Sequence, residues 1–159
     1  SLKANILYPY GSTTGNLTSK SNADSLCNSS KPSGTSQGYA FISFSASEEI
    51  RDLPTTAGID TTLSIKSNSD KLIATNFADM LDASIYMQLS NAGVTSDSWW
   101  SFSDSDGSLR SSYNCNNGTS DSNSVTGTRG SGSYISGSWM VRSNQSCDVL
   151  YQLLCIAKP

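Results

Sequence analysis

The sequence predicts a single α+β domain that covers residues 1–159. Helix-capping patterns occur in the first third of the chain, and short apolar strands separated by long polar loops fill the second half. Helices that come early and strands that come late favour an α+β fold, with mostly antiparallel strands, over an alternating α/β sheet. The length suits one domain, and no central segment has the length or composition of a linker.

In the first half, the apolar pattern predicts two strands and two short helices. Ser19 or Ser21 can cap the first helix, and Ser45 with Glu48 matches a capping box for the second, which should end before Pro54. The expected elements are a strand at residues 4–8 ended by Pro9 and Gly11, a helix at 19–27, a strand at 39–44 and a helix at 46–53.

Further along, the pattern is weaker and mostly β. The last strand alternates so that both of its faces are apolar, which predicts a central position in the sheet. The expected elements are a strand at residues 72–74, a helical turn at 77–81, and strands at 99–102, 139–142 and 149–156.

The composition excludes several classes of function. Charged residues make up 14% of the chain, against roughly 25% in an average protein. The net charge is -3, and the ten basic residues form no cluster, so we expect no nucleic-acid partner. No apolar run is long enough to span a membrane, and the N-terminus lacks a signal-peptide core, so any export signal or anchor is expected to have been removed.

Four cysteines and no histidine narrow the chemistry. Cys27, Cys115, Cys147 and Cys155 form no C-x-x-C pair, so two disulfides fit better than a zinc or redox site. The lack of histidine removes the commonest general base. The close carboxylate pairs, Asp104 with Asp106 and Glu48 with Glu49, are unpersuasive, since Glu48 has a capping role and Glu49 is expected on a solvated helix. We therefore expect no enzymatic activity.

The cysteines and several short motifs occur in an order that can be compared with known protein families. Cys147 and Cys155 are eight apart, and Cys27 is followed by a strand and a Ser-x-x-Glu segment at residues 41–49. These features resemble the C-type-lectin-like fold. A nearer resemblance is to the bacterial DUF1554 family of lectin-like surface lipoproteins. Its motifs here are Ile73-Ala-Thr-Asn-Phe-Ala-Asp79, Trp100, Asp106-Gly107, Asn114-Cys115-Asn116, Gly127, Trp139 and Leu154-Cys155-Ile156.

The resemblance implies a disulfide pairing and a location. The first-helix cysteine would pair with the last one, as Cys27 with Cys155, and Cys115 would pair with Cys147. The protein would be extracellular, at the cell surface or anchored to the outer membrane.

Calcium is the one cofactor that the resemblance raises. The sugar-binding Glu-Pro-Asn loop is missing, and Arg142-Ser143-Asn144 stands where Trp-Asn-Asp would be. Asp104, Asp106 and Asp121 are the weak metal candidates, because calcium prefers carboxylate oxygens. We prefer a plain turn at residues 104–107 and expect no required metal.

The segment from residue 101 to 146 has the composition of a binding surface. Serine, asparagine and glycine adapt their hydrogen bonds, while tyrosine and arginine supply anchors; the three tryptophans are expected in the core. We predict a surface binding or adhesion module for an extracellular protein or glycan. The alternatives are a calcium-dependent lectin and a structural tip or spacer, which could be homo-oligomeric. The candidate ligand-binding residues are Arg110, Tyr113, Asn116, Arg129, Tyr134, Arg142 and Asn144.

Overall fold

The computed structural model describes residues 3–159 and shows an α+β fold built on one mixed sheet. The strand order is β4-β3-β1-β8-β5-β6-β7, with β2 paired to β8. The strands are β1 (Ala4–Thr13), β2 (Gln37–Ala40), β3 (Ser64–Ser67), β4 (Leu72–Ala74), β5 (Ser98–Trp100), β6 (Thr126–Ser131), β7 (Ser143–Ser146) and β8 (Tyr151–Lys158). The helical segments are α1 (Lys20–Ser29), η1 (Ile50–Asp52), α2 (Leu53–Thr56), α3 (Phe77–Met80), α4 (Leu89–Ala92), α5 (Cys115–Gly118) and η2 (Gly137–Trp139).

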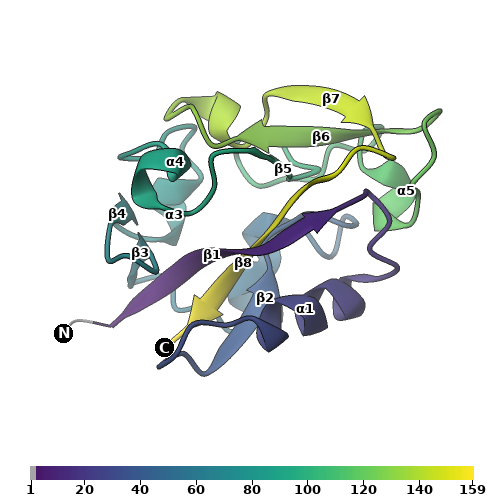
Figure 1. Cartoon of the computed structure of the whole chain (residues 1–159). Coiled ribbons are helices and arrows are strands. Elements are labelled where there is room, and N and C mark those ends of the chain that lie inside the picture. The colour runs from purple at the N-terminus through teal and green to yellow at the C-terminus, as the bar shows by residue number, and fades with distance from the viewer. Residues whose placement is uncertain (1–2) are drawn as a thin grey trace.

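The first and last strands, β1 and β8, lie side by side in the sheet. Figure 1 shows β1 beside β8, with α1 and β2 below them and β6 and β7 above. Short helical segments lie around the sheet, with α3 and α4 on one side and α5 on the other. No helix of residues 3–159 is both long and apolar enough to cross a membrane.

Strand β8 is central and apolar on both faces, as its sequence pattern predicted. It pairs antiparallel with β1 and β2 and parallel with β5. Residues 153–157 are all buried. Leu154 and Ile156 join one apolar cluster, whereas Leu153 and Cys155 join the other. The alternation of β8 therefore separates two cores, one on each side of the sheet.

Strand β1 is longer than predicted. Pro9 and Gly11 do not end it, because a register shift between them accommodates the proline and pairing with β8 resumes up to Thr13. The start of β1 pairs in parallel with β3, a polar strand that the sequence pattern did not predict. The predicted strand at residues 72–74 and the helical turn that follows it are confirmed as β4 and α3.

Helix α1 forms as expected. The Ser19 side chain accepts a hydrogen bond from the Asn22 amide and so caps the helix. Ala23 and Cys27 are fully buried against the core. The Tyr8 hydroxyl donates to the carbonyl of Cys27 and joins β1 to the end of α1.

The predicted helix at residues 46–53 is wrong. Ser45 donates to the Glu48 side chain, but these residues form a turn. The capping box is instead between Glu49 and Asp52 and begins η1, and Pro54 lies in the first turn of α2. Proline is tolerated there because the first amides of a helix have no intrahelical partner.

Two strand predictions also need correction. The strand expected at residues 39–44 ends at Ala40, although the Phe41 amide still donates to the carbonyl of Leu154 in β8. The strand expected at residues 139–142 is wrong, because Trp139 ends η2. The strands that this half does form, β6 and the edge strand β7, are rich in serine, threonine, asparagine and glycine, so they carry no apolar alternation.

All three tryptophans are fully buried, as expected of core residues. Trp99 and Trp139 pack against each other with ring centroids 5.6 Å apart, and Phe41 contacts both. The Trp99 indole donates to the carbonyl of Trp139 at 2.8 Å. Trp100 lies on the opposite face of the sheet and donates to the carbonyl of Thr13.

Burial of Tyr8 gives a prediction for alkaline pH. Burial raises the pKa of the Tyr8 hydroxyl above its usual value near 10. Its contribution to stability is then fully present below about pH 10 and is lost as the pH rises further. Tyr8→Phe should cost about 1 kcal/mol at neutral pH, since the carbonyl of Cys27 keeps its bond from the Ser30 amide.

Urea unfolding at several values between about pH 8 and pH 11 checks this expectation. The free energy of unfolding should fall less steeply with pH in Tyr8→Phe than in the parent. Parallel slopes would show that Tyr8 does not titrate differently in the folded protein.

Candidate functional site

Two disulfides fix the framework on which the loops stand. Cys27 of α1 is bonded to Cys155 of β8, and Cys115 of α5 is bonded to Cys147 just after β7. This is the pairing that the resemblance implies. Such bonds are typical of extracellular proteins. The second disulfide ties the loop between β5 and β6 to the end of β7.

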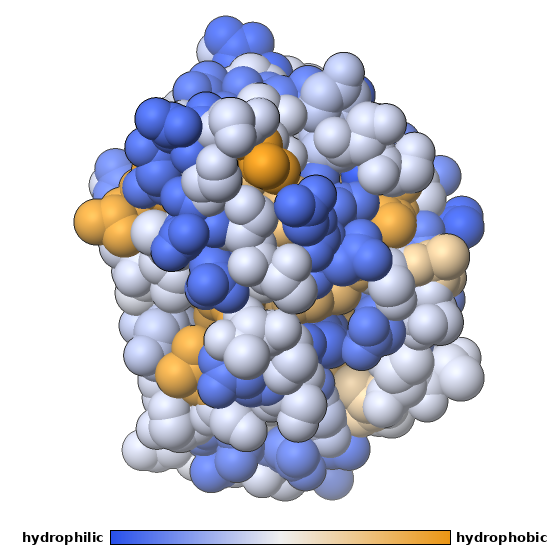
Figure 2. All heavy atoms as spheres, turned by 90° about the vertical axis from the view of Figure 1, so that its right-hand side faces the viewer, coloured by the Kyte–Doolittle hydropathy of each residue, from blue (hydrophilic) through white to orange (hydrophobic). Residues whose placement is uncertain are grey.

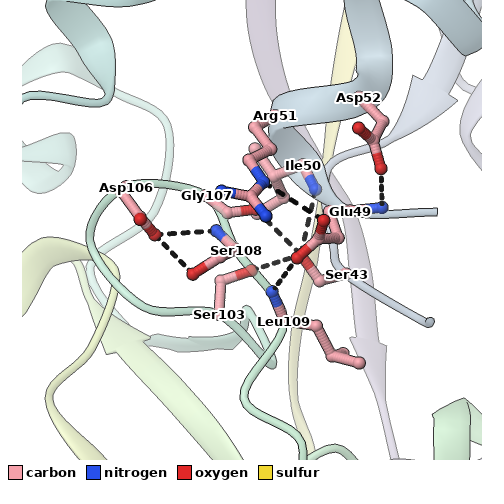
Figure 3. A network of polar contacts seen from close by, with 10 residues as sticks. All are labelled: Ser43, Glu49, Ile50, Arg51, Asp52, Ser103, Asp106, Gly107, Ser108 and Leu109. Carbon is pink, nitrogen blue, oxygen red and sulfur yellow. Dashed lines mark hydrogen bonds and ion pairs between the residues drawn. The ribbon is translucent and has the colours of Figure 1, made fainter. Parts of the chain in front are cut away.

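A buried carboxylate connects this loop region to the first half of the chain. Glu49, only 7% exposed, accepts a hydrogen bond of 2.6 Å from the amide of Leu109 and one of 3.1 Å from Arg51 Nε. The Arg51 amide donates to the carbonyl of Gly107 at 3.2 Å. Figure 3 shows these contacts joining η1 to the turn at residues 106–109. The expectation that Glu49 is solvated is therefore wrong.

Two buried serines extend the same network. The hydroxyls of Ser43 and Ser103 are hydrogen-bonded, and Ser43 Oγ also accepts from the Ile50 amide (Figure 3). Ser43 and Ser103 are both fully buried. Because buried polar groups that keep their partners hold one geometry, this network sets where the chain leaves the core toward residue 110.

The aspartates at residues 104 and 106 build a turn. Asp106 accepts from the hydroxyl and the amide of Ser108, and these bonds, with a smaller effect of nearby Arg51, hold the pKa of its carboxyl below the usual value. Asp104 forms an ion pair with Arg110 at 3.5 Å. Residues 3–159 contain no group of three or more acidic or cysteine side chains placed to hold a metal, and Asp121 is exposed.

The turn opens onto a hollow of about 220 Å³. Arg110 lies over the ring of Tyr113, with 5.2 Å from Cζ to the ring centroid. The Arg110 side chain is 28% exposed and Tyr113 is 37% exposed, so both are accessible. Two predicted binding residues and one weak metal candidate thus share one site, which is lined by Asp104, Leu109, Arg110, Ser111, Ser112 and Tyr113.

Arg129 has a different environment. Its guanidinium donates to the hydroxyls of Ser98 and Ser143, and it lies 5.9 Å from the ring centroid of Tyr151. It therefore holds β5, β6 and β7 together. Asn144 accepts from the Thr128 hydroxyl on the other face of the same strand pair. The structure does not bring Arg129 and Asn144 to one surface.

The last two predicted anchors form a second pair away from the hollow. Arg142 lies over Tyr134, with 4.8 Å from Cζ to the ring centroid. The neighbouring Ile135 is 49% exposed, and its carbonyl accepts from the Ile85 amide, which brings 58%-exposed Tyr86 to the same end of the sheet. This cluster of Tyr86, Tyr134, Ile135 and Arg142 is called the aromatic patch below.

Asn116 lies in a left-handed turn. Residues 115–118 all have positive φ, so α5 is a left-handed turn rather than an ordinary helix. Asn114 caps it by accepting from the Asn117 amide, and Gly118 is required because a Cβ there would lie 2.2 Å from the Phe44 ring. Asn116 is exposed on this turn.

The side of the molecule that carries α5 is mainly polar. Figure 2, which faces this side, shows hydrophobic residues only as separate spots among hydrophilic ones. Large apolar patches mark many protein interfaces, whereas scattered apolar residues are normal on a surface. This face therefore offers hydrogen-bonding groups more than apolar contact.

A second hollow, of about 260 Å³, lies between α1, β2 and α2, on the helical side of the molecule. Each of its charged groups has a hydrogen-bond partner within the protein: Lys20 donates to Asp24, Glu48 accepts from the Ser45 hydroxyl, and Glu49 accepts from Leu109 and Arg51. The Arg110 guanidinium, in contrast, forms an ion pair but no hydrogen bond within residues 3–159. We therefore favour the Arg110 hollow as the candidate site.

Neither protein-family models nor the sequences of curated proteins match this chain.

Proposed function

We propose that this domain is an extracellular binding module whose ligand occupies the Arg110 hollow. The observation that carries the proposal is that the guanidinium of Arg110 has few partners within the protein. Among residues 3–159 its guanidinium forms one ion pair, with half-exposed Asp104, and no hydrogen bond. Arginine has five N–H donors, so most of its binding capacity is open to a ligand.

The surroundings of Arg110 suit recognition. Arginine and tyrosine are, with tryptophan, enriched among the residues that dominate binding energy, and the guanidinium of Arg110 lies over the ring of Tyr113. Glu49 fixes the backbone next to them, because it accepts a hydrogen bond from the amide of Leu109, the residue directly before Arg110. A loop held in this way loses little entropy when a ligand binds.

We further propose that the fold is C-type-lectin-like and that the parent protein is displayed at the cell surface. The disulfide between α1 and β8 and the second one inside the loop-rich half support this fold. The carboxyl groups of Asp104 and Asp106 are used by Arg110 and Ser108. For that reason we favour metal-independent binding over a calcium-dependent lectin.

Arg110→Ala and Tyr113→Ala should each cost roughly 2 kcal/mol or more of binding free energy while leaving the melting temperature nearly unchanged. A glycan array, run together with a pull-down on extracellular proteins, identifies the ligand, and titration calorimetry of the variants then measures the loss. A parallel titration with a calcium chelator should give the parent affinity.

Tyr10→Ala is the matched control, because Tyr10 is 38% exposed on β1 and Tyr113 is 37% exposed. This variant should bind like the parent. If Arg110→Ala and Tyr113→Ala also bind like the parent, the hollow is not the site. Loss of binding on chelation would favour the calcium-dependent alternative.

Self-association is the second candidate function, and the aromatic patch favours it. Three large side chains, Tyr86, Tyr134 and Ile135, are 37% to 58% exposed at one end of the sheet. In a structural tip or spacer, such a patch would contact a second copy of the chain. Analytical ultracentrifugation of the parent and of Tyr86→Ser/Ile135→Ser distinguishes the two, since only an oligomer would dissociate in the variant.

A further inference from the structure

We propose that the Arg110 hollow recognises the carboxylate of an acidic sugar. The inference rests on the proposed function and names the class of ligand for that same site. Three features of the hollow carry it: the open guanidinium of Arg110, the exposed ion pair with Asp104, and the hydroxyl-rich lining.

The guanidinium is suited to a carboxylate. Its planar fork can donate two parallel hydrogen bonds to one carboxylate, an arrangement that is stronger and more specific than a single neutral bond. Arg129 is less suited to this role, because its Nε and Nη1 already donate to Ser143 and Ser98 and so fix the guanidinium between the strands. Arg110 has no such hydrogen bonds within residues 3–159.

The carboxylate of Asp104 contacts the guanidinium that a ligand carboxylate would bind. Its contact with Arg110 is 3.5 Å long, and its side chain is 53% exposed. An exposed ion pair of this kind contributes little free energy, so an incoming carboxylate can replace it at small cost. Asp104 also repels an anion, and its charge therefore tunes the affinity downward.

The size and lining of the hollow favour a sugar over a peptide. Its volume of about 220 Å³ is below the roughly 300–1,000 Å³ of sites for drug-sized ligands, so it suits a single ring. Ser111 and Ser112 offer hydroxyls, and the half-exposed ring of Tyr113 offers a surface for C–H contacts. A peptide side chain would use fewer of these groups.

D-galacturonate and D-galactose are suitable probes, because they share a ring and differ in a carboxylate. Both sugars are titrated into the ¹⁵N-labelled protein at low salt, and the amide shifts of residues 104–113 report binding. The dissociation constant for galacturonate should be at least about tenfold lower than that for galactose. Arg110→Ala and Arg110→Lys should both weaken galacturonate binding about tenfold or more, because lysine lacks the fork.

Asp104→Asn gives the sharpest test, since it should strengthen galacturonate binding, by up to about fivefold from release of the exposed ion pair alone. Lys31→Ala is the control for loss of one exposed positive charge outside the hollow, and it should have no effect. Equal binding of galactose, or weaker binding by Asp104→Asn, would overturn the carboxylate assignment. Equal binding of N-acetylglutamate would overturn the assignment to a sugar.

The two levels of the proposal fail separately. If galacturonate leaves residues 104–113 unshifted while Arg110→Ala still abolishes binding of the ligand found by array or pull-down, the carboxylate inference is overturned and the proposed function stands. If Arg110→Ala leaves the binding of that ligand intact, the site itself is wrong.

Discussion

Replacing Cys27 and Cys155 by alanine should lower the free energy of unfolding by roughly 4 to 5 kcal/mol. The bond joins residues 128 apart in sequence and so closes nearly the whole chain. In the loop-entropy model, a disulfide stabilises mainly by restricting the unfolded chain, and the effect grows with loop length. Chemical denaturation of the oxidised parent and the double variant measures the difference.

The second disulfide provides the comparison. Cys115 and Cys147 are 32 residues apart, so their replacement should cost less, roughly 3 to 4 kcal/mol. Its loss should also loosen the loops around the Arg110 hollow. If the variant without the Cys115–Cys147 disulfide were less stable than the variant without the Cys27–Cys155 disulfide, loop entropy would not be the main source of the stabilisation.

Trp99→Ala should destabilise the fold by roughly 3 to 5 kcal/mol. Trp99 is fully buried, packs against Phe41 and Trp139, and donates a hydrogen bond to the carbonyl of Trp139. Alanine would leave a cavity at the centre of one core and an unpaired buried carbonyl. Thermal and urea unfolding should both show the loss.

Trp99→Phe separates packing from hydrogen bonding, because it keeps an aromatic ring and removes the indole N–H. We expect a smaller cost than for alanine. Arg110→Ala serves as the opposite control, since a loop residue of the candidate site should leave stability nearly unchanged. A Trp99→Ala variant with the melting temperature of the parent would contradict its place in the core.

The elements that the sequence predicted well are those in which local pattern and burial agree. Strand β8 has two apolar faces and lies in the middle of the sheet, and the capping serine at residue 19 begins α1. The polar strands β6 and β7 were missed because their pairing depends on each other and on small residues. Gly130, for example, is needed because a Cβ there would overlap Trp99.

The candidate site was predictable only in part. Composition indicated the region of residues 101–146, and Arg110 and Tyr113 do lie together there. Glu49 was missed, because no local signal tells a buried glutamate from a solvated one. Its partner, the Leu109 amide, is 60 residues away in the sequence. The structural role of Arg129 could not be predicted either, because its partner Ser98 is distant in the sequence and approaches it only in the folded sheet.

An amide chemical-shift map of the protein, bound to the ligand that the array or pull-down selects, tests most directly where binding occurs. We predict that the largest shifts fall on residues 104–113, around Arg110 and Tyr113, with little change elsewhere. The result that would contradict the proposed site is a map centred on the hollow lined by Lys20, Tyr39 and Glu48, because the functional face would then lie on the helical side of the molecule.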